Sequence, residues 1–349
     1  MKLKYTRGAK RKLNSKFEQK EGEMNRSWGR LVMMVVLSGL LLGLVGQAQP
    51  PQYPIKPITI NVPWSPGGGT DRTARALAAS LQEILGVQVG VVNKTGGGGV
   101  IGHRATADAE PDGYTLGMVT VEITMMHWLG LTDLTYRDYD PIALLINNPA
   151  GIIIRTNDVR FQTYEDLVQY IQAHPGELKA TGTAAGGIWH LGLIQWLRGL
   201  GLPADTVRWV PSKGASEGLQ FLLAETVDIC TCSPLEALPL AEQGRVEILA
   251  VMFDRRLSAL PDVPTLQELG VDAVVGGWAG LAGPRGLPAQ VLAVLHKAVF
   301  DAFWSEGFQT FLETSGFNPD FRLGYRFEDF MSQQDQANGE ALQAAGLNR

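Results

Sequence analysis

The chain has 349 residues, 45% of them hydrophobic and 19% charged, and its formal net charge is −5 at pH 7. This acidic balance argues against binding to nucleic acid or anionic lipid through a general positive field. About 300 residues remain after the N-terminal leader described next, which is more than one core organises, so we predict two lobes.

The first 48 residues are predicted to be a leader with a secretory signal peptide that is cleaved after Ala48. A basic segment ends at Arg30, the uncharged run Leu31–Val45 follows, and small residues occupy the −3 and −1 positions. The run is short for a membrane span; an uncleaved anchor is the alternative, and Met24 offers a second start. Removing ten basic and three acidic residues from totals of 30 and 35 leaves 20 and 32, a formal charge of −12.

Two strand–glycine–helix junctions open the mature chain. The first runs from a strand at 58–62 through a turn into a helix at 73–85, and the turn comprises Trp64, Ser65, Pro66, Gly67, Gly68, Gly69, Thr70 and Asp71. The second runs from a strand at 87–92 through Gly96–Gly99 into a helix at 101–109. Glycine turns at helix starts gather N–H groups at the positive end of a helix dipole, which is typical of an anion site.

The β-α alternation continues along the chain. Strands are predicted at 115–120, 142–147 and 151–155, then a helix at 161–173 with Thr163 as its N-cap. A third junction leads from a strand at 178–181 through Gly182, Thr183, Ala184, Ala185, Gly186 and Gly187 into a helix at 188–200. Further strands are predicted at 207–210, 227–231, 248–251 and 276–284, and further helices at 215–224, 235–242, 288–303, 308–314 and 326–344.

This order predicts an α/β fold with two lobes, each a mostly parallel sheet flanked by helices. The strand at 276–284 is expected to cross between the lobes. In such sheets a ligand lies beyond the carboxyl ends of the strands, where the glycine turns are also found.

No arrangement of a nucleophile, a base and an orienting group is recognisable, so we predict no catalytic residues, no enzyme activity and no cofactor. The first glycine turn lacks the Lys-Ser/Thr of a P-loop and the spacing of a dinucleotide fingerprint. Asp71 is interpreted as a helix cap, and His190 is singled out among the histidines because it follows the third glycine loop. Cys230 and Cys232 are predicted to be free, buried thiols, because residues i and i+2 of a strand are poorly placed for a disulfide and two cysteines with no histidine nearby make a weak metal site.

Four blocks of the sequence resemble the extracytoplasmic solute receptors of tripartite tricarboxylate transporters, the TctC or Bug-type family. They are Pro63-Trp64-Ser65-Pro66-Gly67-Gly68-Gly69-Thr70-Asp71, then Val92-Asn93-Lys94-Thr95-Gly96-Gly97-Gly98-Gly99, then Pro111-Asp112-Gly113-Tyr114-Thr115-Leu116, and Leu260-Pro261-Asp262-Val263-Pro264-Thr265. Their order and spacing carry the resemblance over nearly the whole mature chain.

The resemblance implies two α/β lobes that close on a ligand like a flytrap, here as 49–152, 153–275 and a return at 276–349. It implies that a small carboxylate is the ligand and that the membrane permease subunits of a tripartite transporter are the partner. Block matching assigns one carboxylate to the turn at 65–71 and the opposing side to the loop at 182–187. The predicted ligand-binding residues are Trp64, Ser65, Pro66, Gly67, Gly68, Gly69, Thr70, Asp71, Thr120, Gly182, Thr183, Ala184, Ala185, Gly186, Trp189, His190, Cys232 and Ser233.

Some residues depart from the family pattern. Thr183 is the only hydroxyl of the second-lobe loop, where family members carry more, and Trp64 replaces a more common Phe. We therefore expect a ligand with an apolar or aromatic body, bound by a monomeric periplasmic receptor. Two other functions stay open from the sequence: a secreted enzyme acting on a small carboxylate, and a ligand-sensing subunit of a membrane signalling system.

Overall fold

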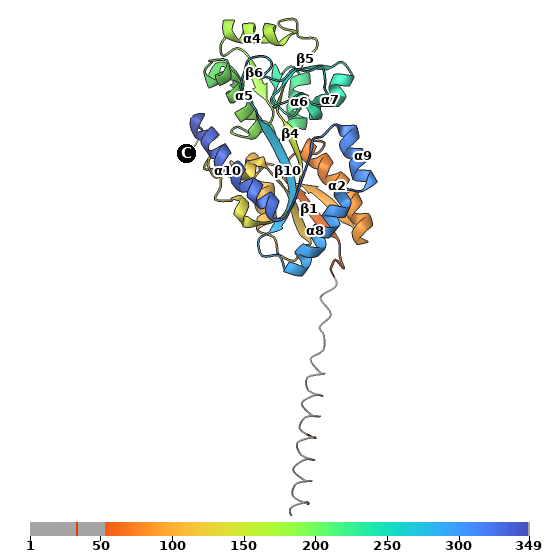
Figure 1. The fold of residues 1–349 in the computed structure, drawn as a ribbon. Coiled ribbons are helices and arrows are strands. Elements are labelled where there is room, and N and C mark those ends of the chain that lie inside the picture. Colours follow the sequence, from red (N-terminus) through yellow and green to blue (C-terminus); the bar gives the residue numbers. More distant parts are fainter. Residues whose placement is uncertain (1–32, 34–52, 348–349) are drawn as a thin grey trace, which may run out of the picture. The chain divides into compact units, whose positions relative to one another are not determined.

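The computed structural model describes Met33 and residues 53–347 (Figure 1). The chain divides into Met1–Gln52 and Tyr53–Arg349, and the following description concerns the second unit. The predicted cleavage site after Ala48 lies outside the described residues. Among the residues described, no helix combines the length and the apolar character that crossing a bilayer would need.

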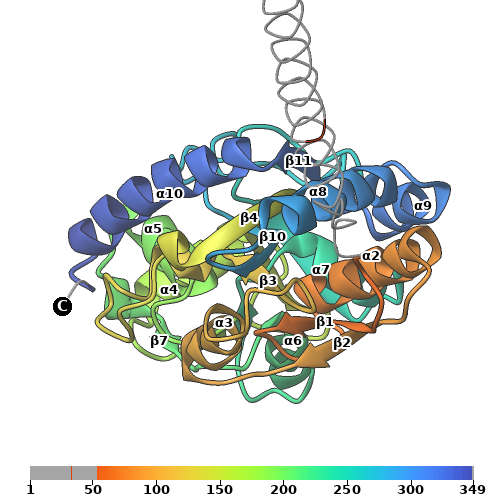
Figure 2. The same ribbon diagram turned by 90° about the horizontal axis from the view of Figure 1, so that it is seen from below.

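The first lobe is built on a six-stranded sheet with the order β11-β4-β10-β3-β1-β2. Its strands are β1 (Ile58–Val62), β2 (Val89–Asn93), β3 (Thr115–Thr120), β4 (Tyr139–Pro149), β10 (Gly276–Pro284) and β11 (Pro319–Leu323). Strands β4 and β10 run side by side through the middle of this lobe (Figure 2). The second lobe has a five-stranded sheet with the order β7-β6-β8-β5-β9. Its strands are β5 (Gly151–Arg155), β6 (Lys179–Thr181), β7 (Arg208–Trp209), β8 (Ile229–Cys230) and β9 (Val246–Val251).

Amphipathic helices cover both sheets. They are α2 (Gly69–Leu85), α3 (Val100–Ala107), α4 (Tyr164–Ala173), α5 (Ile188–Gly199), α6 (Ala215–Leu223), α7 (Pro234–Glu242), α8 (Ala289–Phe303), α9 (Glu306–Ser315) and α10 (Tyr325–Ala344). The predicted N-cap of α4 is confirmed, because the Thr163 hydroxyl accepts from the N–H of Asp166 while the Asp166 carboxylate accepts from the N–H of Thr163. Both Cys230 and Cys232 are free and fully buried, as predicted.

The two-lobed α/β architecture is confirmed, but the sheets are mixed rather than mostly parallel. In the first lobe β1 pairs in parallel with β2 and β3, whereas β10 is antiparallel to both β3 and β4. In the second lobe β6 is parallel to β7 and β8, but β5 is antiparallel to β8 and β9. Strands β5 and β10 enter their sheets from the other lobe. They therefore oppose the strands that local β-α-β units lay down.

The lobes are joined by two crossings that lie next to each other. The chain leaves the first sheet after β4 and enters the second at β5, with Ala150 between them. It returns from β9 to β10 through residues 252–275. The N–H of Ala150 donates to the Val275 carbonyl over 2.7 Å, and the N–H of Met252 donates to the Ala150 carbonyl over 2.8 Å. The two connections are thus hydrogen-bonded into one narrow hinge.

Two helical glycines differ in the space around them: Gly102 of α3 is packed closely against the backbone of the first lobe, and Gly307 of α9 is not. A Cβ on Gly102 of α3 would lie 2.5 Å from Pro63 Cα and 2.7 Å from the Lys94 carbonyl oxygen, so backbone would have to move. Gly307 in α9 has only Ser80 Oγ near its Cβ position, at 3.9 Å.

We expect Gly102→Ala to lower the free energy of unfolding by about 2–4 kcal/mol. Gly307→Ala should be neutral or raise it by up to about 1 kcal/mol, because alanine favours a helix. Urea denaturation of both variants measures this; equal stability of the two would contradict the steric account.

Candidate functional site

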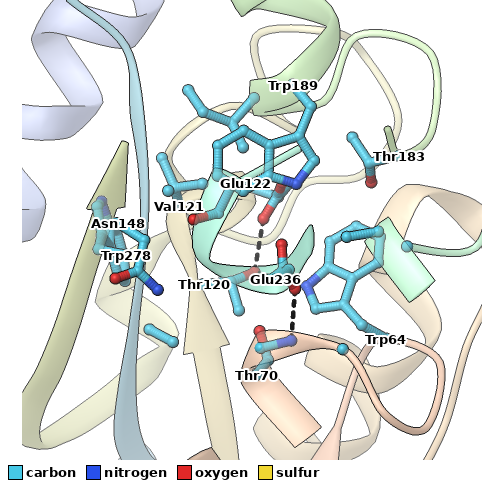
Figure 3. A pocket seen from close by; sticks show the side chains of 18 of the residues that line it. Trp64, Thr70, Thr120, Val121, Glu122, Asn148, Thr183, Trp189, Glu236 and Trp278 are labelled. Atoms are coloured by element: carbon cyan, nitrogen blue, oxygen red, sulfur yellow. Dashed lines mark hydrogen bonds between the residues drawn. The ribbon is translucent and has the colours of Figure 1, made fainter. Parts of the chain in front are cut away.

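A cavity of about 60 Å³ lies between the two sheets. The first lobe contributes Trp64, Ser65, Gly68, Gly69, Thr70, Thr120, Val121, Glu122, Ile146, Asn148, Gly277, Trp278 and Ala279. The second lobe contributes Thr183, Ile188, Trp189, Gly214, Ala215, Ser233 and Glu236. Figure 3 shows Trp64 on one side of this space and Asn148 with Trp278 on the other, with two glutamates between them. A cavity of this volume accommodates only a few waters, so it suits a compact ligand unless the lobes move apart.

Four helix N-termini converge on the cavity. Gly69 begins α2 in the first lobe, while Ile188, Ala215 and Pro234 begin α5, α6 and α7 in the second. Each of these helices follows a strand, so the sheets deliver their N-terminal ends to the same edge. Each N-terminus carries about half a positive charge on N–H groups that have no partner inside the helix. The helix N-termini therefore contribute positive charge to the cavity although no Lys, Arg or His is among the described residues that line it, and the carboxylates of Glu122 and Glu236 in the same lining oppose that charge.

Asp71 holds the first glycine turn in shape. Its carboxylate accepts from the Gly67 N–H over 2.9 Å, from Arg75 Nε over 3.0 Å and from Asn93 Nδ2 over 2.9 Å. Burial alone would raise the pKa of Asp71, but these hydrogen bonds outweigh it and lower the pKa. Gly67 has φ +83°, a conformation that favours glycine. Asp71 thus keeps the turn open toward the cavity without lining the cavity itself.

His103 connects the second glycine loop to the cavity wall. Its Nδ1 bonds to the Gly99 carbonyl over 2.9 Å, and its Nε2 accepts from the Thr120 N–H over 3.2 Å, so the proton is on Nδ1. Burial lowers the pKa of His103 to about 4, which keeps the ring neutral. The Thr120 hydroxyl accepts from Trp64 Nε1 over 3.2 Å and donates to Glu122 Oε2 over 2.6 Å. This network makes the second loop a support for the site rather than part of its lining.

The third glycine loop is braced by His190. Its Nδ1 accepts from the Gly186 N–H over 2.9 Å, and its ring stacks on Trp209 with centroids 4.6 Å apart. Burial lowers the pKa of His190 to about 4. Thr183 and Trp189 from this region line the cavity, whereas His190 is not part of the lining.

Two glutamates cap helices of the opposite lobe. Glu236, at the start of α7, accepts from the N–H of Gly69 at the start of α2 over 2.5 Å. Glu122 follows β3 in the 3-10 turn η2 (Val121–Thr124), and the N–H of Ile188 at the start of α5 interacts with its carboxylate. Burial raises the pKa of Glu122, while the Thr120 hydroxyl and the Ile188 N–H oppose the rise. Each lobe therefore presents a carboxylate to a helix N-terminus of the other.

Four buried polar atoms of the cavity lining have no hydrogen-bond partner among the described residues. They are Ser65 Oγ, Thr183 Oγ1, Ser233 Oγ and Trp278 Nε1. Thr183, Ser233 and Trp278 are 2%, 1% and 2% exposed. A buried polar group without a partner costs about 1–3 kcal/mol. Such groups around one cavity indicate that a ligand or ordered water completes them.

The segment Ser233–Glu236 has the sequence pattern of a capping box but does not form a complete one. In α4 the matching pair Thr163 and Asp166 closes both hydrogen bonds. In α7 the Ser233 hydroxyl makes no capping bond, and the Glu236 carboxylate reaches across to Gly69. Both side chains are thereby available to the cavity.

The structure divides the predicted ligand-binding residues into two groups. Nine line the cavity: Trp64, Ser65, Gly68, Gly69, Thr70, Thr120, Thr183, Trp189 and Ser233. Nine are not in its lining: Pro66, Gly67, Asp71, Gly182, Ala184, Ala185, Gly186, His190 and Cys232. Direct ligand contact remains a prediction for both groups.

Sequence reasoning missed Glu122, Glu236, Asn148 and Trp278. The S-x-x-E pattern at 233–236 was a signal for Glu236, though it indicates an ordinary capping box. Asn148 and Trp278 lie on β4 and β10, strands whose neighbours come from distant parts of the chain. No local pattern reveals a site residue placed that way.

Two α/β lobes with a cavity where helix N-termini converge define the class of periplasmic binding proteins. Residues 73–347 match the tripartite tricarboxylate transporter family receptor. A UPF0065 protein of Bordetella pertussis is 30% identical over 310 residues, which cover 88% of this chain and 95% of that protein. The chain therefore belongs to the tripartite tricarboxylate transporter receptor family, as the sequence blocks predict.

Solved structures agree with this assignment. The periplasmic binding protein BugD matches with a TM-score of 0.79 at 28% identity, over 85% of this chain and 99% of BugD. MatC from Rhodopseudomonas palustris, solved with bound malate, matches with a TM-score of 0.75 at 26% identity, over 83% of this chain and all of MatC (100%).

The charge of Glu236 should make stability depend on pH. Burial raises its pKa from 4.5 to about 6; the Gly69 N–H and Arg72 oppose this and Glu122 adds to it. Because the pKa of Glu236 is higher in the folded than in the unfolded protein, the folded protein binds the carboxyl proton more tightly. Protonation of Glu236 therefore stabilises the fold at low pH, and this stabilisation is lost as the pH rises through about 6. We expect Glu236→Gln to raise the free energy of unfolding at pH 7.5 by roughly 1–2 kcal/mol relative to wild type, and the gap to close at pH 4.5.

Urea denaturation at pH 4.5, 6 and 7.5 measures this difference. Glu242→Gln, an exposed change at the end of the same helix, is the control and should show no such gap. Parallel pH profiles for wild type and Glu236→Gln would refute the assignment.

Proposed function

We propose that this protein is a periplasmic receptor that captures a small carboxylate in the cavity between its lobes and delivers it to the membrane permease of a tripartite tricarboxylate-type transporter. The observation that carries the proposal is the set of unpartnered polar atoms of Ser65, Thr183, Ser233 and Trp278 around one cavity on which four helix N-termini converge. Carboxylate oxygens are strong acceptors for hydroxyl and N–H donors, and charge-assisted bonds of this kind are roughly twice as strong as neutral ones.

The family assignment and the malate bound to MatC support a carboxylate as the ligand class. The lining favours a ligand with an apolar part as well. Trp64, Trp189, Trp278 and Ile146 present apolar surface to the cavity. We therefore propose one carboxylate on a small apolar or aromatic body. A preference for citrate over every aromatic and aliphatic monocarboxylate would count against that finer statement.

The second lobe must contribute to binding if this proposal is right. We expect one ligand to bind per monomer and to be recovered unchanged. Ser233→Ala and Thr183→Val should each weaken binding about tenfold or more, because each removes a hydrogen bond to a charged group. Isothermal titration with mono-, di- and tricarboxylates measures this. Ser258→Ala, which changes an exposed serine, is the matched control. Unchanged affinity in both cavity variants would contradict the proposed site.

Two further measurements distinguish the proposed receptor from the two alternative functions. A secreted enzyme would convert the ligand, which mass spectrometry of the recovered solution detects. A sensing subunit would also bind the ligand without converting it. The membrane protein with which it associates therefore distinguishes a sensor from a transport receptor. Affinity purification from solubilised membranes with the ligand present should recover permease subunits; recovery of a membrane kinase would support the sensor.

Export is predicted to remove residues 1–48. The mature protein purified from the periplasm should begin at Gln49, as N-terminal sequencing would show. A protein that still carries Leu31–Val45 and stays with the membrane fraction would instead support an uncleaved anchor.

A further inference from the structure

We propose that Glu122 and Glu236 select a ligand that carries a protonated nitrogen beside its single carboxylate, and that they select against dicarboxylates. This inference rests on the proposed function, since it concerns the same cavity. The ligand class is then a small amino carboxylate whose cationic nitrogen lies between the two glutamates. Its carboxylate binds the unpartnered donors of Ser65, Thr183 and Ser233.

The first argument is the charge of the cavity. Four helix N-termini supply about half a positive charge each, or about two in total. The two glutamates supply about two negative charges when both are ionised, and the described residues of the lining include no other charged side chain. The protein therefore already neutralises its own helix dipoles. A dicarboxylate would add two negative charges, whereas a zwitterion adds none.

The second argument is the position of the carboxylates. Glu236 occupies the N–H of Gly69, the donor that a ligand carboxylate would use at the start of α2. Glu122 lies at the start of α5, where its carboxylate meets the Ile188 N–H. A second ligand carboxylate would have to displace one of them. Figure 3 shows both carboxylates in the cavity near Thr120, with Trp64 and Trp189 around them. An ammonium group placed there would gain two charged acceptors and indole faces that also favour cations.

The third argument is what remains unpaired. The buried atoms of the lining that have no hydrogen-bond partner are three hydroxyl groups and one indole N–H. None of them needs a positively charged group of the ligand as its partner. Hydroxyl and N–H donors suit one carboxylate. The cavity thus separates into a donor set for an anion and a pair of carboxylates for a cation.

Matched ligand series test the proposal on the mature protein. One series is 4-aminobutanoate, butanoate and succinate; the other is 4-(aminomethyl)benzoate, 4-methylbenzoate and terephthalate. Each compares an amine, a methyl and a second carboxylate on a similar frame. Isothermal titration at pH 7.5 should show the amine-bearing member of at least one series binding at least about tenfold tighter than its partners.

The variants Glu236→Gln and Glu122→Gln keep the side-chain shape and remove the charge. Each should reduce the preference for the amine over the dicarboxylate at least about tenfold, while Glu242→Gln on the exposed end of α7 leaves it unchanged. Circular dichroism at the titration pH confirms that each variant is folded.

Each outcome decides between the two proposals. Tightest binding of a dicarboxylate, or of the methyl member, with no change in Glu236→Gln would overturn this inference and leave the carboxylate receptor standing. Binding of 1,4-diaminobutane without binding of any carboxylate would retain the acidic pair as a cation site and overturn the proposed function. Absence of binding throughout both series and the diamine would overturn both.

Discussion

The convergence of four helix N-termini on one small space is the constraint on which the rest of the site depends. Parallel strand–helix units place those ends at the carboxyl edge of each sheet, and the hinge brings the two edges face to face. The helix dipoles supply positive charge there without any basic side chain in the described lining. Glu122 and Glu236 are tolerated there because each lies against helix N–H groups of the opposite lobe. In an apolar pocket without such donors, two nearby carboxylates would be costly.

Around this cavity the supporting residues have distinct tasks. Asp71 ties the first turn to Arg75 and Asn93, His103 fixes the second loop against β3, and His190 braces the third. None of them lines the cavity, although each lies in or close to one of the three glycine turns. Residues that shape a loop and residues that face the cavity are neighbours in the sequence. The local course of the backbone decides which side chains face the cavity and which support the loop.

Much of the fold follows from sequence periodicity. The strand at 115–120, the strand at 151–155 and the Thr163 cap appear where the pattern placed them. The pairing of β10 with β3 and β4 could not be read locally, because those partners are far apart in the chain. Strand β11 was missed altogether, since Pro319–Leu323 carries Pro, Asp and Arg and is only half-buried.

The site was predictable at the glycine turns and hidden elsewhere. Helix-start chemistry is local, so Ser65, Gly69 and Thr183 could be named from the sequence. The role of Glu236 is not local: the pattern around Ser233 matches that around Thr163, yet one box closes and the other remains open. The difference lies in what stands opposite, here the start of α2, and that is a property of the assembled lobes.

The reactivity of the two buried cysteines can report the local opening of the second sheet. Cys230 ends β8, and Cys232 lies two residues beyond it; neither thiol is exposed. Burial also raises the pKa of Cys232, which disfavours the thiolate that alkylating agents attack. Labelling at these two positions therefore requires the β6-β8-β5 region to open. Because these are the only cysteines in the chain, the rate of thiol labelling reads that local opening without any engineered probe.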